Sequence, residues 1–378
     1  KKSEFLILTF SKKAREDFLK KGMRKDDKLF SEDNIRTIHS LSGLILLNKF
    51  KKKYSDINTV IAGLYYHLIN NDVSLSSVQC LKMCKYIFVD EAQDISEIQY
   101  NTILKLSEMC GAKLILIGDS NQNIYQFQGG SDKFLIEHPG KCIQLVRNYR
   151  STKNIVNFIN NFRPWKDTPP MIADREEEGE LPKIYCNQTQ SLLESIVREI
   201  RNTDIPYEDI AIIGPVRKGK INIHGDNLNF GLQMVAGCFE KNNINYITHY
   251  SLSENDTSNN RVTIRKEGHI NLLTVHGSKG LEFKKVFLLN FHLNTMGRLP
   301  TSNKYKEYKY LWYVGLSRAM DELSIFIESR KPAWTELQYV DQSSYELIGE
   351  NPKYLNQLAK NEKRPELFSI TKLLEDTL

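Results

Sequence analysis

The chain has 378 residues, of which 40% are hydrophobic and 26% charged, which is an ordinary globular composition. A chain of this length is too long for one compact core. A net charge of +6 and a pI near 8.8 suit a polyanionic partner, although proteins that bind no polyanion often carry a similar surplus. No uninterrupted apolar run reaches the roughly eighteen residues of a membrane span. These numbers argue against a membrane protein and against a small single-domain module.

Six cysteines are scattered along the chain, and the pair Cys80 and Cys84 lacks a second Cys/His pair that would complete a zinc site. We therefore expect reduced thiols and a cytoplasmic protein, in a bacterial cell or the host of a virus, or a nuclear one if the source is eukaryotic.

The first part of the chain alternates strand and helix patterns. Strands are predicted at 4–10, 86–90, 113–118 and 142–146, and helices at 12–21, 41–50, 57–70 and 96–109. Because parallel strands are joined by crossover helices, this alternation indicates an α/β domain with a parallel sheet. We place this first domain at residues 1–147, with a short helical insert at about 41–85.

The second part repeats the alternation. Strands are predicted at 183–187, 210–214, 245–249, 270–275, 285–291 and 323–328, and helices at 154–162, 190–202 and 231–241. A second parallel-sheet domain is therefore expected at 148–330. The stretch 163–182 and the polar stretch 251–268 are predicted to be loops, and 331–378 to be a C-terminal extension with weak helical pattern.

The strand pattern Tyr86–Val89 runs directly into two carboxylates, Asp90 and Glu91. Parallel strands of open α/β sheets deliver the residues at their carboxyl ends to the ligand-binding crevice. One carboxylate there can hold Mg²⁺ while the next orients a water for attack on a phosphate. A strand that simply ends in a polar turn is the alternative interpretation.

Further motifs follow this acidic pair in a fixed order. They are Gly118-Asp119-Ser-Asn-Gln122 through Gly130, Val146-Arg-Asn-Tyr149-Arg150, Leu273-Thr274-Val-His276-Gly through Phe283, and Leu311 through Arg318-Ala; two more, Phe5–Ala14 and Ile35–Ser40, precede it. In this order and spacing the segments resemble motifs Ia to VI of superfamily 1 DNA helicases of the UvrD/Rep/PcrA type. The resemblance covers about residues 4 to 328.

The resemblance implies two RecA-like parallel-sheet domains with an interdomain nucleotide cleft. Only about 50 residues separate His39 from Asp90, and about 124 separate Arg150 from Thr274. Large members of the family place additional domains in both gaps. We therefore expect reduced or absent insert domains, which puts strand separation in more doubt than translocation.

The resemblance also assigns a nucleotide site for ATP and Mg²⁺. Asp90 would hold the metal, Glu91 would be the general base, Gln122 would sense the γ-phosphate or water, and Arg150 and Arg318 would be arginine fingers. Tyr149 would stack on adenine and Glu282 would bind the ribose, with Gly280 beside it. The alternatives are a loop amide for Gln122, surface ion pairs for the arginines, a core tyrosine and a solvated glutamate.

Single-stranded DNA needs aromatic platforms beside a basic track. The residues that match DNA-contacting positions of the family are Phe10, His39, Tyr125, Phe127, Thr274 and His276. The family commonly has Trp where Phe127 stands and Arg where Gln128 follows it, so some stacking area and one charge contact are lost. Core packing for Phe127, and satisfied hydrogen-bonding roles for the two histidines, remain alternatives.

One expected motif is missing from this sequence, the Gly-rich phosphate loop that ends in Gly-Lys-Thr/Ser. We expect the natural protein to carry it in a preceding segment, and the chain alone to be inactive without it. The alternative is a natural motor that has lost its phosphate cradle.

The leading hypothesis for function is an ATP-dependent single-stranded DNA translocase or helicase, 3′ to 5′ by resemblance, acting on single strands or single-strand/duplex junctions. One rival is a hydrolysis-deficient nucleic-acid-binding or scaffolding module. Another is a helicase-like subunit of a nuclease-containing antiphage defence complex, with the nuclease as protein partner.

Overall fold

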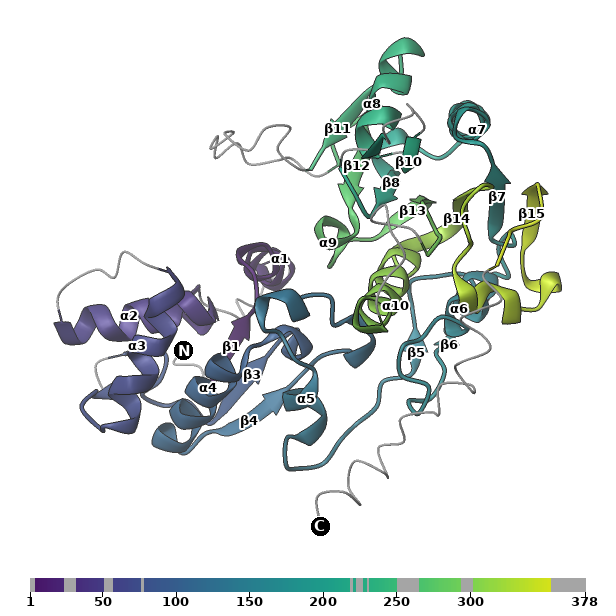
Figure 1. Cartoon of the computed structure of the whole chain (residues 1–378). Helices are drawn as coiled ribbons and strands as arrows, with labels where there is room; N and C mark the ends of the chain where they lie inside the picture. The colour runs from purple at the N-terminus through teal and green to yellow at the C-terminus, as the bar shows by residue number, and fades with distance from the viewer. Residues whose placement is uncertain are drawn as a thin grey trace. The chain divides into compact units, whose positions relative to one another are not determined.

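The computed structural model describes residues 4–23, 32–50, 57–75, 78–217, 220–221, 227–229, 231–249, 265–293 and 302–354. The chain divides into two compact units, Lys1–Cys142 and Ile143–Leu378, each of which is described by itself (Figure 1). None of the described helices is both long and apolar enough to cross a membrane.

The first unit is built on a four-stranded sheet in the order β2-β1-β3-β4, with every neighbouring pair parallel. Its elements are β1 (Phe5–Thr9), α1 (Lys12–Met23), β2 (Ile35–Thr37), α2 (Ile38–Phe50), α3 (Ile57–Ile69), β3 (Tyr86–Val89), α4 (Glu97–Cys110), β4 (Lys113–Leu116) and α5 (Lys133–Glu137). The helices α2 and α3 occupy the stretch where a short helical insert was predicted.

Alternating side chains of the central strands divide the first unit's core between the two faces of the sheet. Leu6 and Leu8 of β1 pack with buried residues of α2, α3 and α4, whereas Ile7 packs with Leu19 of α1. The sheet is thus covered on both faces, as the parallel topology requires. Helix α4 begins with a capping box, in which Ser96 and Gln99 satisfy each other's backbone amides.

The second unit contains a seven-stranded sheet in the order β11-β12-β8-β13-β14-β7-β15, again with parallel neighbours. Its strands are β7 (Lys183–Asn187), β8 (Ile210–Gly214), β11 (Tyr246–Thr248), β12 (Ile270–Thr274), β13 (Phe283–Leu289), β14 (Ala319–Glu328) and β15 (Glu346–Gly349). Two small pairs lie outside it, parallel β5 (Arg147–Asn148) with β6 (Ile172–Ala173), and antiparallel β9 (Lys220–Ile221) with β10 (Asn227–Asn229).

Helices cover both faces of this second sheet (Figure 1). They are α6 (Lys153–Asn160), α7 (Thr189–Arg201), α8 (Leu232–Lys241), α9 (Val275–Ser278) and α10 (Ser302–Leu316). One face packs against buried residues of α7 and α8, including Ile196 and Phe239. On the other face, the ring of Trp312 in α10 lies 5.1 Å from that of Phe291. The two units therefore share the α/β parallel-sheet class that was predicted.

An ion network is buried within the second unit. Lys285 is only 3% exposed, and its ammonium lies 3.2 Å from Glu199 and 2.7 Å from Glu322. The hydroxyl of Tyr185 donates to Glu199 at 2.7 Å. Burial raises the pKa of the Glu199 carboxyl, but the Tyr185 hydrogen bond and the Lys285 charge outweigh it, so the pKa is lowered overall.

The strand predicted at 142–146 is wrong. Ile143 and Leu145 are 73% and 89% exposed, and residues 143–146 belong to no strand. Pairing resumes only where the carbonyl of Val146 accepts from Ile172, at the start of β5 and β6. The segment is apolar, as a buried strand would be, but a strand also needs a neighbouring strand to accept and donate its backbone hydrogen bonds. Among the described residues, β4 pairs only with β3, so residues 143–146 do not extend the sheet on its other side.

Three other expectations differ from the structure. Helix α10 was not predicted, because its many Tyr and Lys residues give it no clear amphipathic pattern. The expected weak helical pattern after residue 330 is in part a strand, because β15 adds to the sheet beside β7. The loop at 163–182 includes β6. Most of the loop predicted at 251–268 lies outside the described residues.

Candidate nucleotide and DNA site residues

The predicted site residues of the first unit lie at one edge of its sheet. Phe10 follows β1, Asp90 and Glu91 follow β3, and Gln122 comes six residues after β4. Parallel strands place all of these carboxyl ends together, and the amide of Asp90 still donates to the carbonyl of Leu8 at 2.9 Å. The sheet therefore brings residues from distant motifs to one corner.

Glu91 adopts the left-handed backbone conformation, with φ 53° and ψ 43°. For a residue with a side chain this costs about 1–2 kcal/mol, so the surroundings must hold it. They do so through the amide of Ala92, which donates to Ile117 at 2.9 Å, and the amide of Asp94, which donates back to the Glu91 carbonyl at 2.9 Å. The Glu91 side chain is half-buried in this turn.

A glutamine that was not predicted as a site residue connects the acids to the next motif. Gln93 is fully buried, its amide nitrogen donates to Glu91 Oε2 at 2.5 Å, and its amide oxygen accepts from the backbone of Asp119 at 3.1 Å. The signal was present in the sequence, because Gln93 lies two residues after Glu91 in the acidic motif, but its burial could not be read there.

The network continues to the predicted phosphate sensor. Gln122 donates to Asp119 Oδ2 at 2.8 Å, and Asp119 Oδ1 accepts from the amide of Asn121 at 2.9 Å. Asp119 therefore caps the short 3-10 turn Ser120–Gln122 and orients the Gln122 side chain. The structure thus joins Glu91 and Gln122 through two intervening residues, the side chain of Gln93 and the backbone amide and carboxylate of Asp119.

The residues present fit Mg²⁺ bound mainly by phosphate and water. Among the described residues, no three His, Cys, Asp or Glu side chains converge as a metal site. A magnesium ion in a nucleotide site commonly takes only one or two carboxylates from the protein. Asp90, half-buried at the end of β3, can supply one such ligand.

Three predicted DNA-contacting aromatics form a row beside this corner. The rings of Phe10 and Tyr125 are 5.3 Å apart, and those of Tyr125 and Phe127 are 6.1 Å apart. Burial, together with the charges of Asp94 and Glu91, raises the pKa of Tyr125 to about 12. Phe127 is 62% exposed, so it is not a core aromatic.

His39 is the second residue of α2 and lies two residues after the end of β2. It is half-buried, and burial lowers the pKa of its imidazole, so the ring is largely neutral at pH 7. A neutral imidazole can donate one hydrogen bond and accept another, but it supplies no lasting charge to a phosphate backbone.

In the second unit the structure pairs two predicted nucleotide residues. Arg150 Nε donates to Glu282 Oε2 at 2.8 Å, and Arg150 Nη1 donates to the carbonyl of Ser317 at 3.0 Å. The side chain of Asn148 accepts from the backbone amides of Arg150 and Ser151 and so shapes the turn. Arg150 is thereby placed where β13 and β14 begin.

Arg318 lies at the same end of the sheet but is only 2% exposed. Its guanidinium donates to the carbonyls of Val314 and Leu281, at 2.9 and 3.1 Å, and to the hydroxyl of Ser317 at 2.7 Å. In this arrangement Arg318 stabilises the junction of α10 and β14. It would have to exchange some of these bonds to reach a phosphate.

The remaining predicted residues of this unit lie in separate places. Tyr149 is 70% exposed, as a base-stacking ring requires. Gly280 has φ +75° and an open position for a Cβ, so its backbone conformation favours glycine. Thr274 caps the short helix α9 by accepting from Gly277 at 3.1 Å, at the carboxyl end of β12 and thus at the opposite edge from Glu282. His276 follows within α9.

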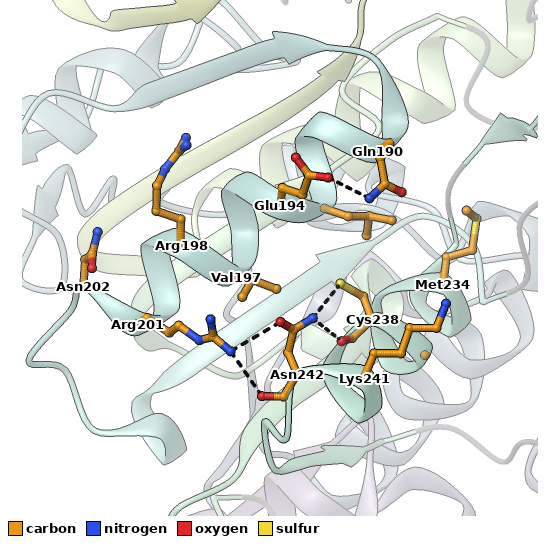
Figure 2. A pocket seen from close by; sticks show the side chains of 12 residues that line it. Gln190, Glu194, Val197, Arg198, Arg201, Asn202, Met234, Cys238, Lys241 and Asn242 are labelled. Atoms are coloured by element: carbon orange, nitrogen blue, oxygen red, sulfur yellow. Dashed lines mark hydrogen bonds between the residues drawn. The ribbon is translucent and has the colours of Figure 1, made fainter.

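A groove of about 730 Å³ lies elsewhere in the second unit, between α7 and α8 (Figure 2). Its floor includes Leu193 and Val197, and Figure 2 shows Asn242 bonded to Arg201 and Cys238 at its rim. The groove lies on a helix-covered face of the sheet, and no predicted site residue lines it. It is a gap between two covering helices rather than the nucleotide site.

The comparisons with known proteins match both halves of the chain. The UvrD/REP helicase N-terminal domain matches residues 49–141, and the UvrD-like helicase C-terminal domain matches residues 237–330. A protein named as an ATP-dependent DNA helicase of Acanthamoeba polyphaga mimivirus is 31% identical over 99% of this chain and 54% of its own length.

Two bacterial relatives are also named as DNA helicases. A protein named as a DNA helicase of Mycoplasma pneumoniae is 25% identical over 74% of this chain and 51% of its own length. The ATP-dependent DNA helicase PcrA of Staphylococcus epidermidis is 42% identical over 34% of this chain and 19% of its own. Both halves of the chain are thus similar to UvrD/PcrA-like helicases of superfamily 1. The chain spans about half the length of the first two relatives.

Proposed function

We propose that the protein is an ATP-dependent translocase on single-stranded DNA that moves 3′ to 5′ and opens duplexes at single-strand junctions. The observation that carries the proposal is the chain of contacts from Glu91 through Gln93 and Asp119 to Gln122. Such a network orients a carboxylate and an amide at the carboxyl edge of a parallel sheet, where these folds act on nucleotides. The similarity of both halves of the chain to UvrD-like helicase domains supports the same function.

In the proposed reaction, Glu91 accepts a proton from a water as the water oxygen forms a bond to the γ-phosphorus of ATP. The bond from that phosphorus to the bridging oxygen breaks, and ADP leaves with its electron pair. Gln122 holds the water or the γ-phosphate in line. Asp90 would hold Mg²⁺, which when bound neutralises charge on the phosphates.

Arg150 is the stronger arginine-finger candidate of the two. Its guanidinium is about one-third exposed and is held by a carboxylate that ribose or phosphate groups can replace. Arg318 instead stabilises the junction of α10 and β14, and this junction positions Arg150 because both arginines donate hydrogen bonds to Ser317.

The aromatic row Phe10, Tyr125 and Phe127 is the proposed platform for DNA bases. Stacking on such rings is tolerant of sequence and is worth about 1–3 kcal/mol per base. DNA binding should also weaken steeply with salt, because backbone contacts release counterions.

The test is ATP hydrolysis and translocation by the full-length natural protein. We expect turnover to rise with single-stranded DNA, and streptavidin to be displaced faster from the 5′ end than from the 3′ end of a biotinylated strand. DNA binding without DNA-stimulated turnover would contradict the proposal and favour a binding or scaffolding module. Release from the 3′ end only would contradict the polarity. Co-purification of a nuclease would place the motor in a larger complex.

A further inference from the structure

We propose that Gln93 is a positioning residue for the general base, holding the Glu91 carboxylate in the orientation that accepts a proton from water. This inference rests on the proposed function of Glu91. The position of Gln93 in the motif does not by itself assign it a role. The inference is carried by three observations within the first unit.

The first observation is that both ends of the Gln93 amide are used. Its nitrogen donates to Glu91 Oε2 at 2.5 Å, and its oxygen accepts from the Asp119 amide at 3.1 Å. The reverse orientation of the amide would set an oxygen against a carboxylate and an NH₂ group against an N–H. The two partners therefore determine which end of the amide is the nitrogen and which is the oxygen.

The second observation is confinement. Gln93 is fully buried, and a Cβ at Gly118 would lie 2.3 Å from its Oε1 and 3.1 Å from the amide nitrogen of Ala92. The space that a side chain would occupy at residue 118 is thus filled by the Gln93 amide. A buried side chain with both polar ends paired has little rotamer freedom, so it can fix the geometry of its partner.

The third observation is the condition of Glu91 itself. It sits in a left-handed backbone conformation directly after a strand, a conformation that persists only where neighbours hold it. Backbone bonds hold the turn, but the carboxylate is four bonds from that backbone and needs its own contact. Gln93 supplies one and links it to the strand end that carries Asp119 and Gln122.

Two substitutions separate positioning from a purely structural role. Gln93→Met keeps the volume and removes both hydrogen bonds. Gln93→Glu keeps an oxygen to accept from Asp119 but removes the donor to Glu91. Thr102→Val is the matched control, because Thr102 is a buried hydrogen-bonding residue of the same unit whose hydroxyl bonds only within α4, to Ile98.

In the full-length protein, we expect Gln93→Met and Gln93→Glu each to lower the kcat of DNA-stimulated ATP hydrolysis about 10- to 100-fold, with KM for ATP within about twofold of wild type. Thr102→Val should leave kcat unchanged. Amide exchange gives a readout besides activity. The Asp119 amide should exchange about fivefold faster in Gln93→Met and at the wild-type rate in Gln93→Glu.

The outcomes are distinguishable. Wild-type kcat in Gln93→Met would overturn the inference, and so would wild-type kcat in Gln93→Glu beside a loss in Gln93→Met, since Gln93 would then only clip two loops together. Full turnover in Glu91→Gln, measured in parallel, would instead overturn the proposed function. Loss in Glu91→Gln with no loss in either Gln93 variant would leave the proposed function standing and refute only the positioning role.

Discussion

Gly118→Ala should disturb the acid corner from a position that touches no substrate. The new methyl would lie 2.3 Å from Gln93 Oε1 and 3.1 Å from both the Ala92 nitrogen and a Leu135 methyl carbon. The backbone atom cannot give way cheaply, so the Gln93 side chain must move. Overpacking of this kind costs about 1–3 kcal/mol. For a unit of this size each kcal/mol lowers the melting temperature by about 4 °C.

The matched control is Gly43→Ala in α2, where a Cβ would meet nothing within 4 Å. Alanine is the better helix former, so this substitution should stabilise the same unit by about 0.5–1 kcal/mol. Amide exchange over β3 and β4 measures the first unit separately from the second. If Gly118→Ala unfolds at the wild-type temperature and keeps wild-type ATP turnover, the tight packing around Gln93 is not as described.

Five further substitutions test the arginines, the buried ion network and the aromatic row. Arg318→Ala should destabilise the second unit by about 3 kcal/mol in urea unfolding, because it leaves buried carbonyl groups without a donor. Arg150→Ala should cost at most about 1 kcal/mol, because the Arg150 side chain is about one-third exposed; equal costs would contradict the assignment. Lys285→Met should cost about 3 kcal/mol. The pKa of Glu199 is lowered in the folded protein, so its ionised carboxylate stabilises the fold above its usual pKa of 4.5, and this stabilisation is lost as the pH falls below that value. A free energy of unfolding that stays constant from pH 6 to pH 3 would refute this. Phe127→Ala should weaken single-stranded DNA binding by about 1–3 kcal/mol in fluorescence anisotropy, with Phe127→Trp at or above wild type; unchanged affinity in Phe127→Ala would remove Phe127 from the platform.

Most of the fold could be predicted because its strands are short apolar runs bounded by helices and turns. The strands that begin near residues 5, 86, 183, 210 and 270 were predicted within two residues of their observed starts. The errors have a common cause, since pattern alone does not say which neighbour a segment will find. Residues 143–146 look like a strand and have no strand partner, while 346–349, from a stretch predicted to have weak helical pattern, form a strand at a sheet edge.

The site was predictable to the level of motifs but not of contacts. Spacing placed Asp90, Glu91 and Gln122 in one region, and the structure joins two of them through Gln93 and Asp119. Nothing in the sequence distinguishes the partly exposed Arg150 from the buried Arg318, because the burial of Arg318 depends on how α10 packs, and that helix was not predicted.

The most direct measurement of the central claim is the ATP turnover of Glu91→Gln in the full-length protein, beside its affinity for a fluorescent ATP analogue. The side chains are nearly the same size, so binding should stay within about threefold while DNA-stimulated turnover falls by at least about 100-fold. A variant that binds the analogue and hydrolyses ATP at the wild-type rate would show that the carboxylate at residue 91 is not the base.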